Sequence, residues 1–76
     1  MADRLPALRP DQVIRALEQA GLQVIRQTGA HAIMHKEGLP RPVPVPHHTG
    51  DLKRGLLAHI IREAGLTQEE FRRFTG

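Results

Sequence analysis

The stretch Arg26-Gln27-Thr28-Gly29-Ala30-His31 decides the fold, because it predicts the turn of a β-hairpin with a histidine at the start of the second strand. Gly29 allows the backbone conformations that a tight turn needs, and Thr28 adds a short polar side chain. Apolar residues alternate on both sides of the turn, with Val24 before it and Ile33 after it. The pattern therefore predicts two short antiparallel strands.

These two strands are expected over residues 22–27 and 30–35. If they pair through Thr28-Gly29, Arg26 lies directly opposite His31. Opposed residues of an antiparallel pair share a face, with Cβ atoms about 4.5–5.5 Å apart. The hairpin therefore predicts a guanidinium beside an imidazole.

A third strand is predicted by prolines at every second position. Alternate backbone N–H groups of a strand point to opposite edges, so this spacing removes the donors from one edge only. The bare edge also resists pairing with another chain. The segment is thus expected at the edge of the sheet, with residues 30–35 as the central strand. The prolines are Pro40, Pro42, Pro44 and Pro46.

Hydrophobic matching sets the expected register of this edge strand, with Val45 opposite Ile33. This register brings His47 opposite His31. A slip by one residue would instead place Pro46 beside His31 and bring the second histidine of the pair, His48, close to it. The predicted core face of the sheet consists of Val24, Ile33 and Val45.

Three helices complete the chain. The first is expected to begin near Pro10 and to stop at Gly21. The second begins within residues 51–55 and ends at Gly65, and the segment Thr67–Glu70 has the capping-box pattern that opens a short third helix. The apolar stripe predicted for the second helix is Leu56, Leu57, Ile60, Ile61 and Ala64.

The composition favours one small α+β domain over residues 1–76, with residues 1–9 as a loose lead-in. Hydrophobic residues make up 39% of the chain, and no apolar run approaches the roughly 18 residues of a membrane span. The first residues lack the apolar stretch of a secretory signal, and the chain has no cysteine. These features favour a protein of the cytoplasm that does not bind membranes.

Several chemistries are disfavoured by the residues present. The chain has no serine, no glycine-rich phosphate loop and no dinucleotide fingerprint. His31 and His35 lie four residues apart on one strand, about 13 Å at roughly 3.3 Å per residue, so they cannot share a metal ion. We therefore expect no metal and no cofactor.

The charge balance suits a polyanion such as nucleic acid, with 11 Lys and Arg against 8 Asp and Glu, although an ordinary protein can also be basic. RNA supplies its own nucleophile, the 2′-hydroxyl, so an enzyme need only move protons and hold the phosphate. Imidazole transfers protons at neutral pH. We expect His31 as the general acid/base, Arg26 and His47 as helpers, and Lys53 and Arg54 as contacts to the RNA backbone. The simpler interpretation of His31 is that it is a surface residue that follows a turn. The other histidines are most simply interpreted as solvated or rim residues, namely His35, His48 and His59.

Four blocks of the sequence, in order and at compatible spacing, resemble the HicA toxins of bacterial toxin–antitoxin pairs. They are Arg26–His31, Val43–His47, Leu52–Leu56 and Ile60–Leu66 within a likeness over about residues 10–74. The resemblance implies a double-stranded-RNA-binding-like fold, cleavage of mRNA without a metal, and a HicB antitoxin that covers the active surface. The histidine of the family that follows a Gly-Ser pair corresponds to His31, and Ala30 stands here in the serine position.

The hypothesis is therefore a small endoribonuclease toxin whose partners are mRNA and a HicB-like antitoxin. Two alternatives remain open. A non-catalytic RNA-binding module of the same fold would bind RNA and leave it intact. A protein-interaction domain with a basic face would bind an acidic partner and ignore RNA at physiological salt.

Overall fold

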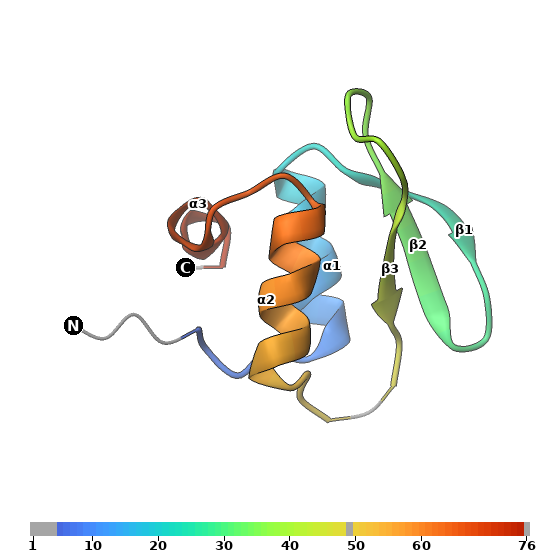
Figure 1. Cartoon of the computed structure of the whole chain (residues 1–76). Helices are drawn as coiled ribbons and strands as arrows, with labels where there is room; N and C mark the ends of the chain where they lie inside the picture. The colour runs from blue at the N-terminus through green and yellow to red at the C-terminus, as the bar shows by residue number, and fades with distance from the viewer. Residues whose placement is uncertain (1–4, 49, 76) are drawn as a thin grey trace.

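The computed structural model describes residues 5–48 and 50–75. The chain runs helix, three strands, helix and short helix, as the sequence predicts (Figure 1). The elements are α1 (Pro10–Gln19), β1 (Gln23–Gln27), β2 (His31–His35), β3 (Val43–Pro46), α2 (Arg54–Glu63) and α3 (Gln68–Arg73).

Helices α1 and α2 both end at a glycine, as predicted. Gly21 has a φ of 103° and Gly65 a φ of 79°, the left-handed region that residues with a Cβ avoid. After α1, the N–H of Leu22 donates to the carbonyl of Leu17 at 3.0 Å. This Schellman bond satisfies a carbonyl that the helix leaves unpaired and turns the chain towards β1.

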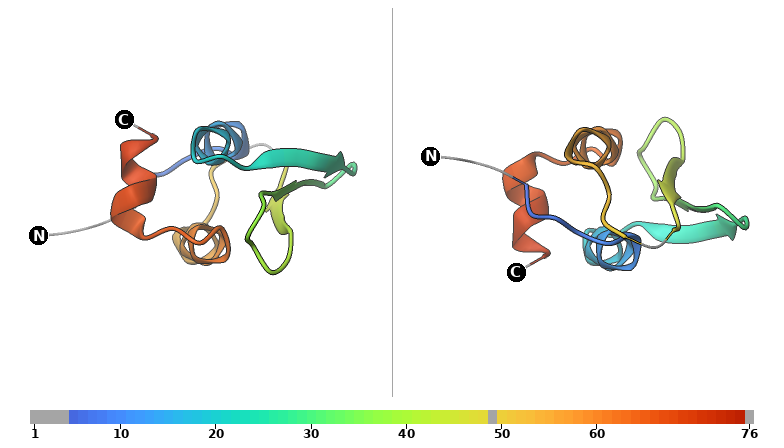
Figure 2. Two further views of the ribbon diagram at one scale, coloured as in Figure 1. Left: turned by 90° about the horizontal axis from the view of Figure 1, so that it is seen from above. Right: turned by 90° about the horizontal axis from the view of Figure 1, so that it is seen from below.

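The short helix α3 begins with the predicted capping box. Thr67 Oγ1 accepts from the N–H of Glu70 at 3.0 Å, and Glu70 Oε1 accepts from the N–H of Thr67 at 2.9 Å. Phe71 on this helix is fully buried. Figure 2 shows α3 on the far side of the α1–α2 pair from the sheet, so the helix pair forms the middle of the molecule.

The sheet has the predicted order β1-β2-β3, which leaves the proline strand at an edge. The N–H of His47 donates to the carbonyl of Ala30 at 2.8 Å. Hydrogen-bonded pairs recur every second residue along an antiparallel ladder, so Val45 and Val43 also face β2 with their N–H groups. The prolines between them leave the outer edge without donors, as expected.

The predicted register of β3 against β2 is wrong by one residue. Val45 lies opposite Ala32 and Val43 opposite Met34, rather than Val45 opposite Ile33. Helices α1 and α2 cover the face that carries these four residues, all of them buried. Of the predicted core face, Val45 is buried as expected, but Val24 is 37% exposed and Ile33 is half-buried on the other face.

The register of β1 against β2 is also not the predicted one. Gln23 lies opposite His35 and Val24 opposite Met34, but the pairing then shifts, and Arg26 lies opposite Ile33. The shift marks a β-bulge at Ile25. The turn between β1 and β2 has two residues and no positive φ, and such a turn does not match the right-handed twist of a hairpin. A bulge in β1 raises that twist locally.

The N-terminal segment is not a loose lead-in over its described part. Leu5 and Leu8 are 5% and 7% exposed and belong to the hydrophobic core. The carbonyl of Leu8 accepts from the N–H of Leu52 at 2.9 Å, which ties the segment to the connection before α2. Residues 1–4 lie outside the described part of the chain.

The predicted stripe of α2 is buried except at Leu56, which is 38% exposed. The three-stranded antiparallel sheet packs against α1 and α2, and this is the double-stranded-RNA-binding-like α+β layout that was expected. Within residues 5–48 and 50–75, no helix has the length and apolar content needed to cross a bilayer.

Candidate functional site around His31

The β1–β2 turn is closed by the side chain of Thr28 rather than by a glycine conformation. Thr28 Oγ1 accepts from the N–H of His31 at 2.9 Å and from the N–H of Ala30 at 3.3 Å. The N–H of Thr28 donates to the carbonyl of His31 at 2.9 Å, and its hydroxyl donates to the same carbonyl at 3.2 Å. Thr28 and His31 thus form the closing pair, so the two-residue loop is Gly29-Ala30 rather than the predicted Thr28-Gly29, and Gly29 keeps an ordinary φ.

These contacts fix the backbone of His31 from both sides. His31 is the first residue of β2, and its side chain is half-buried. The burial of β2 alternates, with Ala32 and Met34 buried, so His31 shares the opposite, outer face with Ile33 and His35. The imidazole therefore lies at one end of the sheet, on the face that the helices do not cover.

Arg26 does not lie directly beside His31, because the bulge moves it one place along the ladder. It faces Ile33 across the strands and is thus on the outer face, as a diagonal neighbour of His31. Diagonal neighbours are about 7–8 Å apart, with their Cβ atoms somewhat closer, and are within reach of a long side chain. The predicted pairing is wrong in register, but the guanidinium and the imidazole share a face.

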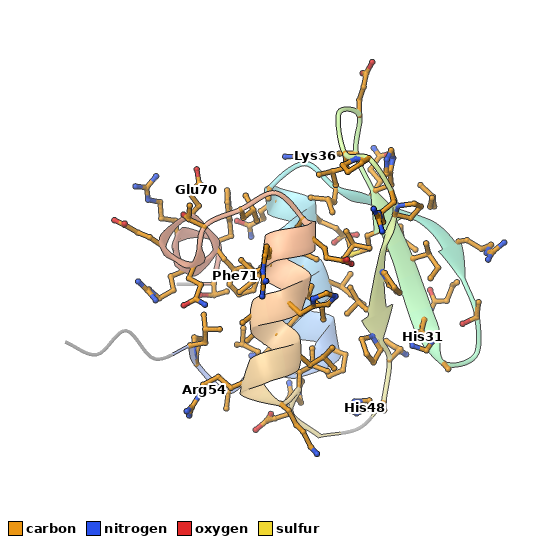
Figure 3. The ribbon with its side chains drawn as sticks, in the orientation of Figure 1. His31, Lys36, His48, Arg54, Glu70 and Phe71 are labelled. Atoms are coloured by element: carbon orange, nitrogen blue, oxygen red, sulfur yellow. The ribbon has the colours of Figure 1, made fainter. Side chains whose placement is uncertain are left out.

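The shift in β3 also changes which histidine accompanies His31. Pro46 lies opposite His31, and His47 is paired with Ala30. By alternation, the exposed His47 side chain belongs to the face of Val45, away from the imidazole of His31. Figure 3 shows His48 at the same end of the sheet as His31. The alternative slip of one residue is thus the observed arrangement.

Lys53 and Arg54 begin α2, as the N-cap residue and the first helical residue, and both are exposed. The side chain of Arg54 points away from His31 (Figure 3). It borders a small hollow with Leu5 and Pro6 at the N-terminal segment. The structure therefore does not bring Arg54 together with the imidazole.

Two other histidines have partners that the sequence analysis missed. Nε2 of His35 donates to the carbonyl of Leu39 at 3.1 Å, and Nε2 of His59 lies 3.4 Å from a carboxylate oxygen of Glu63. His35 therefore anchors the β2–β3 connection rather than remaining solvated. Among the described residues, no three His, Asp or Glu side chains converge as a metal site would require.

Thr28 is the main residue of the site that sequence reasoning undervalued. Its signal is present, because a threonine three residues before a strand histidine can bond the backbone of a turn. Gly29 beside it is the commoner type of turn-forming residue. The hydroxyl of Thr28, however, makes the contacts that position His31.

The comparison with known families bears on this arrangement. A family model described as "HicA toxin of bacterial toxin-antitoxin" matches residues 10–66. This range holds α1, the whole sheet with its turn, and α2. The chain belongs to the HicA toxin family. HicA proteins are the toxins of bacterial toxin–antitoxin systems and pair with an antitoxin. No curated protein matches the chain.

Proposed function

We propose that this HicA-family protein is an endoribonuclease that cleaves mRNA, with His31 as its general acid/base. The observation that carries the proposal is the backbone of His31, held by Thr28 on both its N–H and its carbonyl, with the ring half-buried on the uncovered face. Proton transfer requires a positioned imidazole that substrate can reach. Membership of a toxin family supports the same role.

In the proposed reaction, neutral His31 takes the proton of a ribose 2′-hydroxyl. The 2′-oxygen then attacks the adjacent phosphorus, and the bond from phosphorus to the 5′-oxygen breaks. Water at the open face protonates the leaving 5′-oxygen, and the hydroxide that forms takes the proton back from His31. The products are one RNA with a 2′,3′-cyclic phosphate and one with a 5′-hydroxyl. No metal enters these steps.

Arg26 is proposed to hold a phosphate oxygen during this step, because it lies on the outer face within reach of His31. Lys53, exposed at the start of α2, is proposed to attract the RNA backbone at longer range, together with Arg54. His47 has no place in this scheme, because its side chain belongs to the other face of the sheet.

The test is cleavage of end-labelled mRNA in the presence of EDTA by wild-type protein and by His31→Ala. The wild type is expected to cleave, and His31→Ala to lose activity by about 100-fold or more, the range for a general acid/base. His47→Ala provides a matched control and should keep most of the activity. Equal cleavage by wild type and His31→Ala would refute the assignment. RNA that is bound but left intact by the wild type would identify the non-catalytic binding module.

The proposed protein partner is a HicB-type antitoxin that covers the outer face around His31. The family pairs with antitoxins, which supports the existence of the partner. Co-expression with the product of the neighbouring open reading frame should suppress growth arrest and block RNA binding in vitro. Suppression without loss of RNA binding would mean that the antitoxin covers a different surface.

A further inference from the structure

A second basic site lies at the far end of the sheet from His31. It is an open hollow of about 380 Å³ between the β2–β3 connection and the C-terminal half of α2. Leu39 and Pro40 give it an apolar side, and Arg41 and Arg62 contribute two guanidinium groups. Its size is near the lower end of ordinary ligand sites. We refer to it as the loop hollow.

The connection that forms this hollow is fixed at Leu39. The ring of His35 donates to the carbonyl of Leu39 at 3.1 Å, and the N–H of Leu39 donates to the carbonyl of Lys36 at 3.2 Å. A Cβ on Gly65 would lie only 3.3 Å from Cδ2 of Leu39, so the glycine lets the connection sit close to the end of α2. Arg41, two residues after Leu39, and Arg62 both line the hollow.

The charges of the loop hollow favour an anion. Within the described part of the chain, neither Arg41 nor Arg62 makes an ion pair, and both are exposed. The one carboxylate in the wall, Glu63, lies 3.4 Å from Nε2 of His59. Guanidinium groups bind phosphate through two parallel hydrogen bonds, and the apolar side can receive a ribose or a base.

We propose that the loop hollow is a subsite for a phosphodiester segment of single-stranded RNA, remote from the cleaved bond. The proposal rests on the proposed endoribonuclease function. Arg41 precedes Pro46, the partner of His31, by five residues, which span at most about 17 Å. At the roughly 3.4 Å rise of a stacked strand, this distance corresponds to about five nucleotides. An RNA strand that passes around the β3 edge, from the α2 side of the sheet to the outer face, can therefore reach both sites.

The experiment uses the Arg41→Gln/Arg62→Gln double variant and, as a control, Arg15→Gln. Arg15 is an exposed residue of α1 that lies away from the loop hollow, so the control removes a cation without touching the site. Binding of a labelled 12-nucleotide RNA is measured in a His31→Ala background across a range of salt concentrations. Circular dichroism confirms that every variant folds.

The double variant is expected to bind at least tenfold more weakly at low salt. Its slope of log affinity against log salt should fall by about 1.4, since each lost phosphate contact on a single strand contributes about 0.7. With His31 intact, its KM for the 12-nucleotide RNA should rise at nearly unchanged kcat. Its cleavage of a trinucleotide, too short to reach both sites, should match wild type.

A double variant that behaves like Arg15→Gln in RNA binding would overturn the subsite while leaving cleavage by His31 intact. Weaker binding of the antitoxin with unchanged RNA binding would also overturn it and identify a protein contact instead. If the wild type cleaves no RNA but the double variant still loses RNA affinity and salt slope, the nuclease function fails and the RNA subsite stands.

Discussion

The turn at Thr28 makes the sharpest prediction. Thr28→Val keeps the shape and β-branching of the side chain but removes the hydroxyl. Three contacts disappear: the bond accepted from the N–H of His31 at 2.9 Å, the one accepted from Ala30 at 3.3 Å, and the one donated to the carbonyl of His31 at 3.2 Å. All three are solvent-exposed, so water can replace them. Each should contribute at or below the lower end of the usual ~0.5–1.5 kcal/mol.

We expect a total loss of about 1 kcal/mol in the free energy of unfolding. For a domain of this size, that loss lowers the melting temperature by about 4–8 °C. The assay is thermal and urea unfolding followed by circular dichroism. Thr28→Ser keeps the hydroxyl and should lie within about 0.5 kcal/mol of wild type. On the proposed function, Thr28→Val should also lower kcat by about tenfold or more, because the backbone that carries the imidazole of His31 loses two of its hydrogen bonds.

Two results would refute this reasoning. If Thr28→Val is as stable as the wild type, the hydroxyl does not hold the turn. If Thr28→Ser is destabilised as much as Thr28→Val, the loss comes from packing or strand propensity rather than from hydrogen bonds. Either result would also remove the argument that Thr28 positions His31.

Three further predictions concern stability and association. Gly29→Ala should be neutral or should stabilise the protein by up to about 1 kcal/mol, because Gly29 has an ordinary φ and open space around its Cα. Gly21→Ala should destabilise the protein, because Gly21 has a φ of 103°. Urea unfolding of both variants measures the two changes in the free energy of unfolding. Pro44→Val should restore an N–H donor on the outer edge of β3 and raise self-association in analytical ultracentrifugation, and a strictly monomeric variant would contradict the edge argument. The N–H of Thr67 donates to the carboxylate of Glu70, and this hydrogen bond lowers the pKa of Glu70. The stability that the ionised carboxylate contributes is therefore complete above about pH 5 and is lost as the pH falls through the lowered pKa. The melting temperatures of wild type and Glu70→Gln should therefore converge as the pH falls below the lowered pKa of Glu70, and a gap that does not narrow on acidification would rule out the carboxylate as its cause.

Local chemistry in the sequence was enough to predict the elements. Glycines at 21 and 65 end their helices with positive φ, and the Thr67–Glu70 capping box forms as expected. The spacing of the prolines predicted an edge strand, and β3 is at the edge. Each of these features acts within a few residues of its own position, so no knowledge of distant contacts was needed.

The site was predictable only as a set of residues. The turn and its histidine follow from the sequence, and His31 does begin β2. Its neighbours do not follow, because a shift of one residue in a strand moves every side chain to the other face. In β2, Ala32 and Met34 form one apolar face, and Ile33 lies on the other. The alternation of residues in the sequence is compatible with burial of either face.

The sequence by itself therefore determined which segments become helices, strands and turns, and which residue types are present for chemistry. Only the tertiary structure decided the bulge at Ile25, the face that the helices cover, and the burial of Leu5 and Leu8. The physical reason is that strand register and core membership depend on the fit between distant segments. Burial of either apolar face of the sheet would be favourable if the face is large enough. Which face is buried is decided only when the helices pack against it.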